Sequence, residues 1–328
     1  MSNLMRPPKP HLDNVAKIAD FAEIECLLRG DGSVSRLDIA RIVQRRGDHA
    51  IDAAATDDDV SRSVAEAFDE LETRSRHCGP DDGRYPFVVR DKGKVLCLRD
   101  DRSDNAPPPT TYFYLLLATR MNMQSERRQA DEDATVLFEQ FCREVAVRYW
   151  GGPADSIGAI VFGTGRLTED LDDGDELNRN SFVNAVNHLT KELKEGHKFE
   201  ADPNSQVRAK DGKLDIVVWR RFADERQGQL IGFGQCKTGT HWADDLIKLR
   251  PDDFFTKWVY KRAAVLPVRM YFVTDRVTTQ WFERCVDGGI LFDRCRIMEY
   301  ASDLPTELND RMAKWVRRAA NSKGLALP

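Results

Sequence analysis

Two short apolar segments, joined by a polar loop, constrain the fold of this chain more than any other part of the sequence. Residues 214–222 read LDIVVWRRF, residues 230–237 read LIGFGQCK, and the loop 223–228 lies between them. Apolar segments of strand length separated by a short polar loop favour an antiparallel β-hairpin. The hairpin brings the start of the first segment beside the end of the second.

Polar side chains gather at that shared end. Folding the chain at the loop centre places Asp215 opposite Cys236, and so beside Gln235 and Lys237. Side chains alternate along a strand, so Gln235 and Lys237 share a face. Asp215 is expected to anchor Mg²⁺ (or Mn²⁺) together with the backbone carbonyl of Cys236, while Lys237 orients water and stabilises charge on a phosphate.

The amide of Gln235 carries no charge, so this set is short of one negative ligand. We expect the missing carboxylate on the helix predicted at 133–150, with Glu139 as the first candidate and Glu144 as the second. Both lie on the polar side of that helix, whose apolar stripe has the i, i+4 spacing of a buried face.

These residues resemble the PD-(D/E)xK, restriction-endonuclease-like nuclease superfamily. Asp215 followed by Gln235-Cys236-Lys237 is similar to its Mrr-like branch, which has Gln-x-Lys, although Lys213-Leu214 stands where a Pro is usual. The resemblance implies a metal-dependent endonuclease that acts on DNA in prokaryotic restriction or phage defence. It also implies a mixed central sheet flanked by helices, and in this family a winged helix can precede the nuclease domain.

Two alternatives stay open. The neutral Gln235 also fits a nucleic-acid-binding or regulatory protein that keeps the fold without cleavage, and a buried Asp–Lys pair in an ordinary sheet gives the same pattern. The residues 205–262 contain 12 Lys/Arg against 8 Asp/Glu, which suits contact with phosphate. Either a solvated surface or a nucleic-acid contact explains the flanking residues Arg220, Arg221, His241, Lys257 and Lys261.

The region before residue 106 is predicted to be a winged-helix-like α+β module, with helices at 14–29 and 61–76, a helix between them that starts near Ser35, and two strands at 86–90 and 94–98. Its third helix carries the acids Glu66, Asp69, Glu70 and Glu72, which would repel DNA phosphates. Docking of a protein partner is one interpretation of this module. DNA contact through the basic wing, Arg90, Lys92 and Lys94, is the other.

The expected organisation is a module at 1–105, a linker and connecting segment at 106–132, and an α/β nuclease domain at 133–328. Three prolines within 103–111 indicate an extended spacer. After the first helix of the nuclease domain we expect strands at 157–162, 214–222, 230–237, 269–274 and 290–300, and helices at 181–194, 251–262, 278–286 and 306–321.

Seven dispersed cysteines, without a C-x-x-C pair, suggest free thiols in a reducing cytoplasm. The longest apolar run, 112–118, is too short to span a bilayer, so no membrane contact is expected. DNA is the expected partner, and a homo-oligomer is compatible with the sequence.

Overall fold

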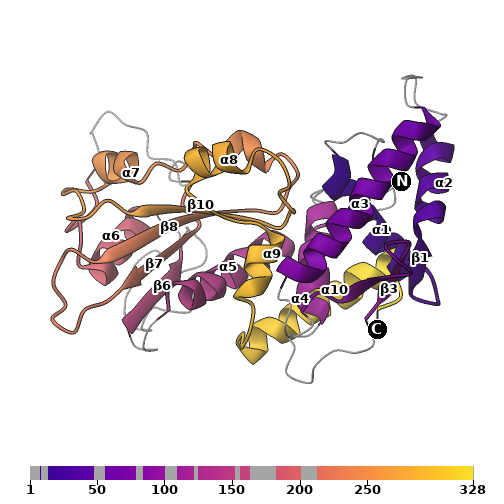
Figure 1. Cartoon of the computed structure of the whole chain (residues 1–328). Coiled ribbons are helices and arrows are strands. Elements are labelled where there is room, and N and C mark those ends of the chain that lie inside the picture. Colours follow the sequence, from indigo (N-terminus) through magenta and orange to yellow (C-terminus); the bar gives the residue numbers. More distant parts are fainter. Residues whose placement is uncertain are drawn as a thin grey trace.

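The computed structural model describes Pro8 and residues 14–47, 56–78, 84–99, 109–121, 125–151, 156–162, 182–200 and 213–327. Figure 1 shows two lobes side by side, one built on a large sheet and one mainly helical. Helices α4 (Pro109–Arg120) and α9 (Arg294–Glu299) lie where the lobes meet.

The helical lobe begins with three helices and a small sheet. The chain order is α1 (Val15–Leu28), β1 (Ser33–Ser35), α2 (Arg36–Gly47), α3 (Asp57–His77), β2 (Phe87–Arg90) and β3 (Val95–Leu98). The three strands are antiparallel in the order β1-β3-β2. The predicted helices and hairpin are confirmed, but β1 was missed because three residues are too few for an alternating pattern to register.

The larger sheet has five strands in the order β10-β9-β8-β7-β6. The inner hairpin is antiparallel, whereas β9 lies parallel to β8 and β10 parallel to β9. This mixed α/β sheet is the architecture expected from the sequence. Its elements are α5 (Ala134–Trp150), β6 (Ile157–Val161), α6 (Phe182–Leu193), β7 (Ile216–Arg220), β8 (Leu230–Lys237), α7 (Pro251–Trp258), β9 (Val268–Val273), α8 (Trp281–Gly288) and β10 (Ile290–Phe292).

Helices cover both faces of this sheet. Ile216 and Val218 of β7 face α5 and join its core, whereas Val217 and Trp219 join the core formed with α6 and α7. This alternation is what a strand with one apolar layer on each side requires. Each face of β7 therefore has a defined neighbour, and this identifies the faces of the residues at the candidate site.

The segment expected to be a linker is largely structured. Pro109 opens α4, whose residues Thr111–Thr119 are all buried, and β4 (Arg128–Gln129) pairs with β5 (Glu132–Asp133) in a short hairpin. Residues 103–108 of the expected spacer lie outside the described residues. Residues 112–118 thus lie inside the core. A helix that is buried on all sides is apolar on all sides, and this accounts for the longest apolar run of the sequence.

One hydrophobic core runs through both lobes. It joins residues of α1 and α3 to residues of α4, α5 and the last helix, α10 (Thr306–Lys323). The predicted boundaries at 105 and 132 therefore do not coincide with a division of the core.

The predicted strand at 290–300 was wrong beyond its third residue. β10 ends at Phe292, and Asp293 then caps α9 by accepting a hydrogen bond from the backbone N–H of Arg296 at 3.1 Å. An Asp at this position favours a helix start, but the apolar residues of α9 give a pattern that strands also show. Helix α7 likewise ends at Trp258, earlier than the predicted residue 262.

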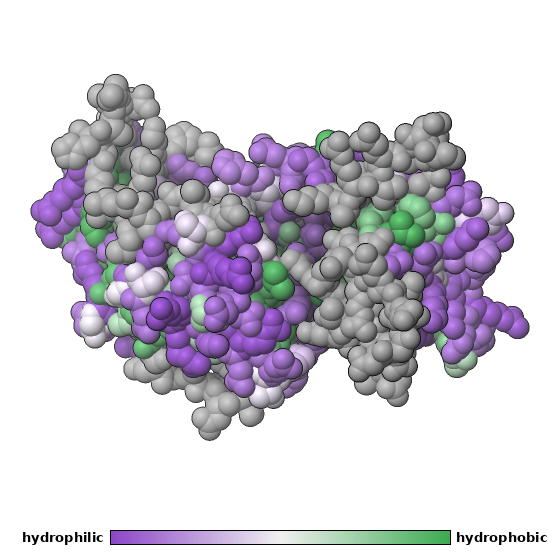
Figure 2. Space-filling model, turned by 180° about the vertical axis from the view of Figure 1, so that it is seen from behind, coloured by the Kyte–Doolittle hydropathy of each residue, from purple (hydrophilic) through white to green (hydrophobic). Residues whose placement is uncertain are grey.

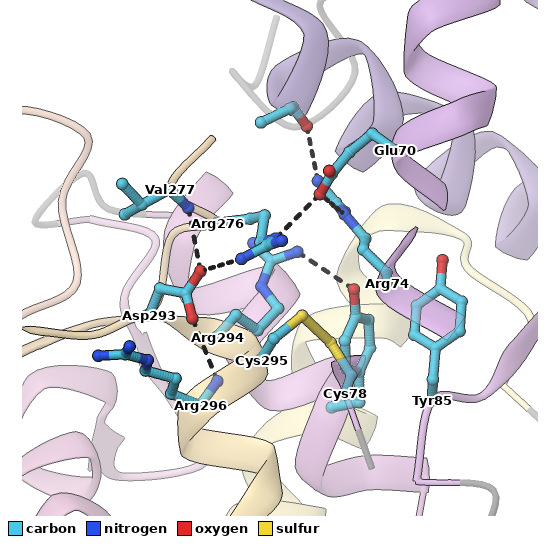
Figure 3. Close-up of a disulfide and its surroundings, with 12 residues drawn as sticks. Glu70, Arg74, Cys78, Tyr85, Arg276, Val277, Asp293, Arg294, Cys295 and Arg296 are labelled. Carbon is cyan, nitrogen blue, oxygen red and sulfur yellow. Dashed lines mark hydrogen bonds and ion pairs between the residues drawn. A yellow bond between two sulfur atoms is a disulfide. The ribbon is translucent and has the colours of Figure 1, made fainter. Parts of the chain in front are cut away.

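A buried ionic network connects the lobes, and Figure 3 shows its part around Glu70, Arg276 and Asp293. Arg294 of α9 forms two bonds with Asp20 of α1, at 2.8 and 3.0 Å, and Arg74 of α3 bonds Asp20 at 2.7 Å and Glu23 at 3.0 Å. All four side chains are almost completely buried. Burial raises the pKa of Asp20, but Arg294 and Arg74 outweigh it and hold that pKa below its ordinary value.

The network continues at its edge through Glu70. This residue of α3 accepts from Arg74 at 3.1 Å and from Arg276 at 2.9 Å, and Arg276 also pairs with Asp293. Glu70 was expected to lie among the acids of a groove-reading helix. It instead points inward and holds α3 against the sheet lobe.

A disulfide joins Cys78, at the end of α3, to Cys295 in α9 (Figure 3). The expectation that all seven cysteines are free is therefore wrong for these two. Their separation of 217 residues in the sequence hid the pair, since only the folded lobes bring them together.

None of the helices in the described ranges is long and apolar enough to cross a membrane. The face in Figure 2 is mainly hydrophilic, and its hydrophobic residues form small separate patches.

We expect Arg294→Ala to lower the free energy of unfolding by about 3–5 kcal/mol, because it leaves Asp20 buried without its bidentate partner. The control is Arg296→Ala in the same helix, where an exposed guanidinium lies over the Trp281 ring; its loss should be about 1 kcal/mol. Urea denaturation measures both. The difference should shrink below about pH 4, because the stability contributed by an ionised Asp20 is lost as pH falls. Equal losses at neutral pH would contradict the role of the network.

We also expect Cys78→Ser to lower the free energy of unfolding by about 2–5 kcal/mol, because the bridge closes a long loop in the unfolded chain. Cys285→Ser changes a free, partly exposed cysteine and should have little effect. Titration of thiols in denaturant, without reductant, should find the five free cysteines Cys26, Cys97, Cys142, Cys236 and Cys285. Seven reactive thiols would exclude the bridge.

Candidate functional site

The β7–β8 hairpin forms as predicted, with its register shifted by one residue. Ile216 pairs with Gly234 and Arg220 with Leu230, so continuation of the register places Asp215 opposite Gln235 rather than Cys236. The Asp215 carboxylate accepts a hydrogen bond from the backbone N–H of Cys236 at 2.7 Å. Asp215 and the end of β8 are therefore in direct contact.

Gln235 and Lys237 share one face of the sheet. Phe233 belongs to the core on the α6–α7 side and Cys236 to the core on the α5 side. Alternation along the strand then places Gln235 and Lys237 on the same side as Phe233.

Asp215 lies at the end of the sheet, within electrostatic reach of both faces. On the α5 side, burial raises the pKa of Cys142; a hydrogen bond with Cys236 opposes that rise, and the charge of Asp215 adds to it. On the other side, burial raises the pKa of Tyr271, and the charges of Asp245 and Asp215 add to that rise. This carboxylate can act together with groups from either layer.

The side-chain oxygen of Gln235 is buried without a hydrogen bond. Gln235 is 1% exposed, and no donor in the described part of the chain reaches its Oε1. An unsatisfied buried amide oxygen costs free energy unless something occupies its lone pairs. A hard cation such as Mg²⁺ would satisfy it.

Lys237 has a partner that the sequence did not suggest. Its ammonium lies 2.9 Å from Asp245 Oδ2, in the 3₁₀ helix η4 (Trp242–Asp245). Both line a pocket of about 340 Å³ together with Gly239, Thr240, His241 and Trp242. His241 is thus the one flanking residue that the structure places beside Lys237.

The helix α5 brings Glu139 to the level of the site. Trp150 lies against Gly232 and Cys142 against Cys236. From Cys142 to Trp150 the helix rises about 12 Å, and from Cys236 back to Gly232 the strand covers about 13 Å. The two contacts therefore match only if α5 runs antiparallel to β8. Glu139, 9% exposed and one turn before Cys142, therefore lies near the level of Lys237, but on the opposite face of the sheet.

Glu144 occupies a different environment. Its carboxylate pairs with Arg148 at 2.9 Å and with Arg143 at 3.6 Å. Arg148 also bonds the carbonyl of Ser302 at 2.6 Å, so Glu144 stabilises the contact between α5 and the chain before α10.

The other candidate nucleic-acid contacts lie away from Asp215. Arg220 and Arg221 stand at the far end of β7, where Arg221 stacks on Trp219 and lines a separate pocket of about 610 Å³. Lys257 is exposed on α7, 3.9 Å from Asp253, and Lys261 is exposed after that helix.

The donor set can be compared with what Mg²⁺ requires. In the described ranges, no three His, Cys, Asp or Glu side chains form a metal-binding group. The unsatisfied amide oxygen of Gln235 and the carboxylate of Asp215, which lies opposite it in the hairpin, are hard oxygens of the kind that Mg²⁺ prefers. These residues fit a weakly charged metal site with several waters.

Comparisons with known proteins add little. The chain matches no family model and no curated protein. Among solved structures it is similar to protein VC1899 from Vibrio cholerae, with 14% identity over 87% of this chain and 80% of that one. The TM-score is 0.17, too low to support any conclusion about fold or function.

We expect Gly234→Ala to destabilise the hairpin at the candidate site. An added Cβ would lie 2.5 Å from Cγ1 of Ile216, the residue next to Asp215, and 3.2 Å from the Phe272 ring. Overpacking of this kind costs about 1–3 kcal/mol. At Gly30 a Cβ would meet nothing within 4 Å, so Gly30→Ala is the control. Thermal denaturation of both variants tests the expectation, and a Gly234→Ala protein as stable as the control would refute it.

Proposed function

We propose that the chain is a metal-dependent endonuclease that hydrolyses phosphodiester bonds, with DNA as its substrate. The observation that carries this proposal is the meeting of Asp215, Gln235 and Lys237 at one end of the β7–β8 hairpin. The resemblance of Asp215 and Gln235-Cys236-Lys237 to the Mrr-like branch of the PD-(D/E)xK superfamily supports it. On the same resemblance we propose a role in prokaryotic restriction or phage defence. The cytoplasmic location proposed for it rests on the five cysteines outside the disulfide; the Cys78–Cys295 bridge is of a kind that is rare in that compartment.

Each residue has a role that follows from its chemistry. Asp215 and the Gln235 amide oxygen would hold Mg²⁺ or Mn²⁺, with the backbone carbonyl of Cys236 as a third oxygen. The bound ion would lower the pKa of a coordinated water and stabilise the phosphate charge. Lys237 cannot ligate a cation, so it contributes positive charge to the phosphate oxygens.

Glu139 is the candidate for a further ligand. It is near the level of the site, and Asp215 at the end of the sheet is within electrostatic reach of both layers. A ligand from the α5 side would have to approach around the end of β8. Glu144 is less suited, since two arginines already hold it.

The first part of the helical lobe has the element order α1-β1-α2-α3-β2-β3, which supports the winged-helix-like module proposed from the sequence. With Glu70 turned inward, Glu66, Asp69 and Glu72 remain exposed on α3. We propose that this surface docks a protein partner, while the β2–β3 turn offers the basic residues Arg90, Lys92 and Lys94 for DNA contact.

A second candidate function is nucleic-acid binding without cleavage. The observation that favours it is the neutral amide of Gln235, which leaves the site short of one negative metal ligand. Cleavage assays on variants separate the two candidates.

In a plasmid-cleavage time course with Mg²⁺ or Mn²⁺, wild-type protein should cleave and Asp215→Ala should not. Asp215→Ala should also lose metal binding in a calorimetric titration, because it removes the anionic ligand. Lys237→Ala should bind metal normally and cleave about 10²–10³-fold more slowly. Gln235→Glu should bind the metal more tightly, since it adds a negative charge to the site.

Lys257→Ala changes an exposed lysine of α7 and serves as the matched control for loss of a positive charge. If Lys257 contacts a DNA phosphate, this variant should bind DNA more weakly, but its cleavage rate at saturating DNA should equal that of the wild type. Full cleavage by Lys237→Ala would exclude the mechanism. Unchanged metal affinity in Asp215→Ala would exclude the metal assignment.

A further inference from the structure

The partner of Lys237 is itself held in place. Asp245 accepts from Lys237 at 2.9 Å through Oδ2, and Lys248 bonds its other oxygen, Oδ1. The hydrogen bonds from Lys248 and from Lys237 hold the pKa of Asp245 below its ordinary value. Asp245 is therefore ionised at neutral pH, between two ammonium groups.

The short helix that carries Asp245 is anchored on both sides. Trp242 is buried; its ring N–H donates to Asp275 at 3.1 Å, and its carbonyl accepts from the Tyr271 hydroxyl at 2.9 Å. Leu246, directly after Asp245, is buried against Gly288. Exposed ion pairs are usually weak because both side chains must be ordered. Here the backbone that carries the carboxylate is already fixed by buried contacts.

Asp245 and Asp215 both lie within electrostatic reach of the same tyrosine in the sheet. The charges of Asp245 and of Asp215 both act on Tyr271, whose ring belongs to the same sheet face as Lys237. Lysine has a long flexible side chain with many rotamers. Without Asp245 the Lys237 ammonium would have no acidic partner within the part of the chain that the structure describes.

We propose that Asp245 is a positioning residue, which holds the Lys237 ammonium against the 340 Å³ pocket that both residues line, ready for the substrate phosphate. The inference rests on the proposed nuclease function. It assigns to Asp245 a contact with the catalytic lysine and not with the metal.

The first test is the kinetics of Asp245→Asn, which keeps the shape of the side chain and removes its charge. We expect kcat to fall about 10–100-fold, as for other residues that orient an active group, with KM for plasmid and the calorimetric metal affinity unchanged. Asp245→Glu should recover part of the rate by restoring the ion pair.

The matched control is Asp244→Asn, the same charge change one residue earlier on the same short helix, at an exposed position. It should leave kcat unchanged. Equal rates for Asp244→Asn and Asp245→Asn would overturn the proposal. Loss of metal affinity in Asp245→Asn would overturn it as well, because Asp245 would then be a ligand.

A second measurement does not need activity. Brief labelling with acetic anhydride, read by peptide mass spectrometry, reports how accessible the Lys237 amine is. We expect about two- to five-fold more labelling of Lys237 in Asp245→Asn than in Asp244→Asn, the range for loss of a partly exposed ion pair. If wild-type protein fails to cleave but this difference appears, the nuclease proposal fails while the ion pair is supported. Equal labelling in the two variants would refute the positioning of Lys237.

Discussion

The bidentate contact between Arg294 and Asp20 is the interaction on which the arrangement of the two lobes depends. It joins the first helix of the chain to a helix that follows the last strand of the large sheet. Its charges are shielded from water, so the loss of either leaves the other buried with weaker compensation. Thr274, at the end of β9, accepts from Arg294 through its backbone carbonyl, and its hydroxyl donates to the carbonyl of Thr238 just after Lys237. The same contact thus fixes the lobes and supports the strand ends at the candidate site.

This connection has a consequence for the site itself. Polar side chains lie at the ends of β8 and β9, including Lys237 and Thr274. Helix α4 contacts this end of the sheet through the hydrogen bond between Thr119 and Thr274, at 2.9 Å. The helical lobe therefore lies directly against the strand ends of the candidate site.

Much of the fold followed from local patterns. Strand β8 was predicted with its observed bounds because its apolar run is enclosed by a polar loop and a charged end. The register was wrong by one residue, since the pairing depends on how the turn at 221–229 is built and not on the loop centre. Arg294 and Cys295 were read as part of a strand, because their partners, Asp20 and Cys78, are more than 200 residues earlier in the sequence. Asp245 was missed for a related reason: its neighbourhood has no periodic pattern, and only the folded loop brings its carboxylate to Lys237.

The sharing of one core by both ends of the chain also bears on how the protein is made. Asp20 and Glu23 belong to a helix that is made early, whereas Arg294 lies 274 residues after Asp20 and is made much later. Until then the acidic side chains of α1 can pair with Arg74 but not with Arg294, and the apolar face that α10 shares with α4 stays uncovered. The helical lobe therefore completes its core only after Arg294 and α10 have been made. Apolar surface that stays exposed until then is of the kind that promotes aggregation.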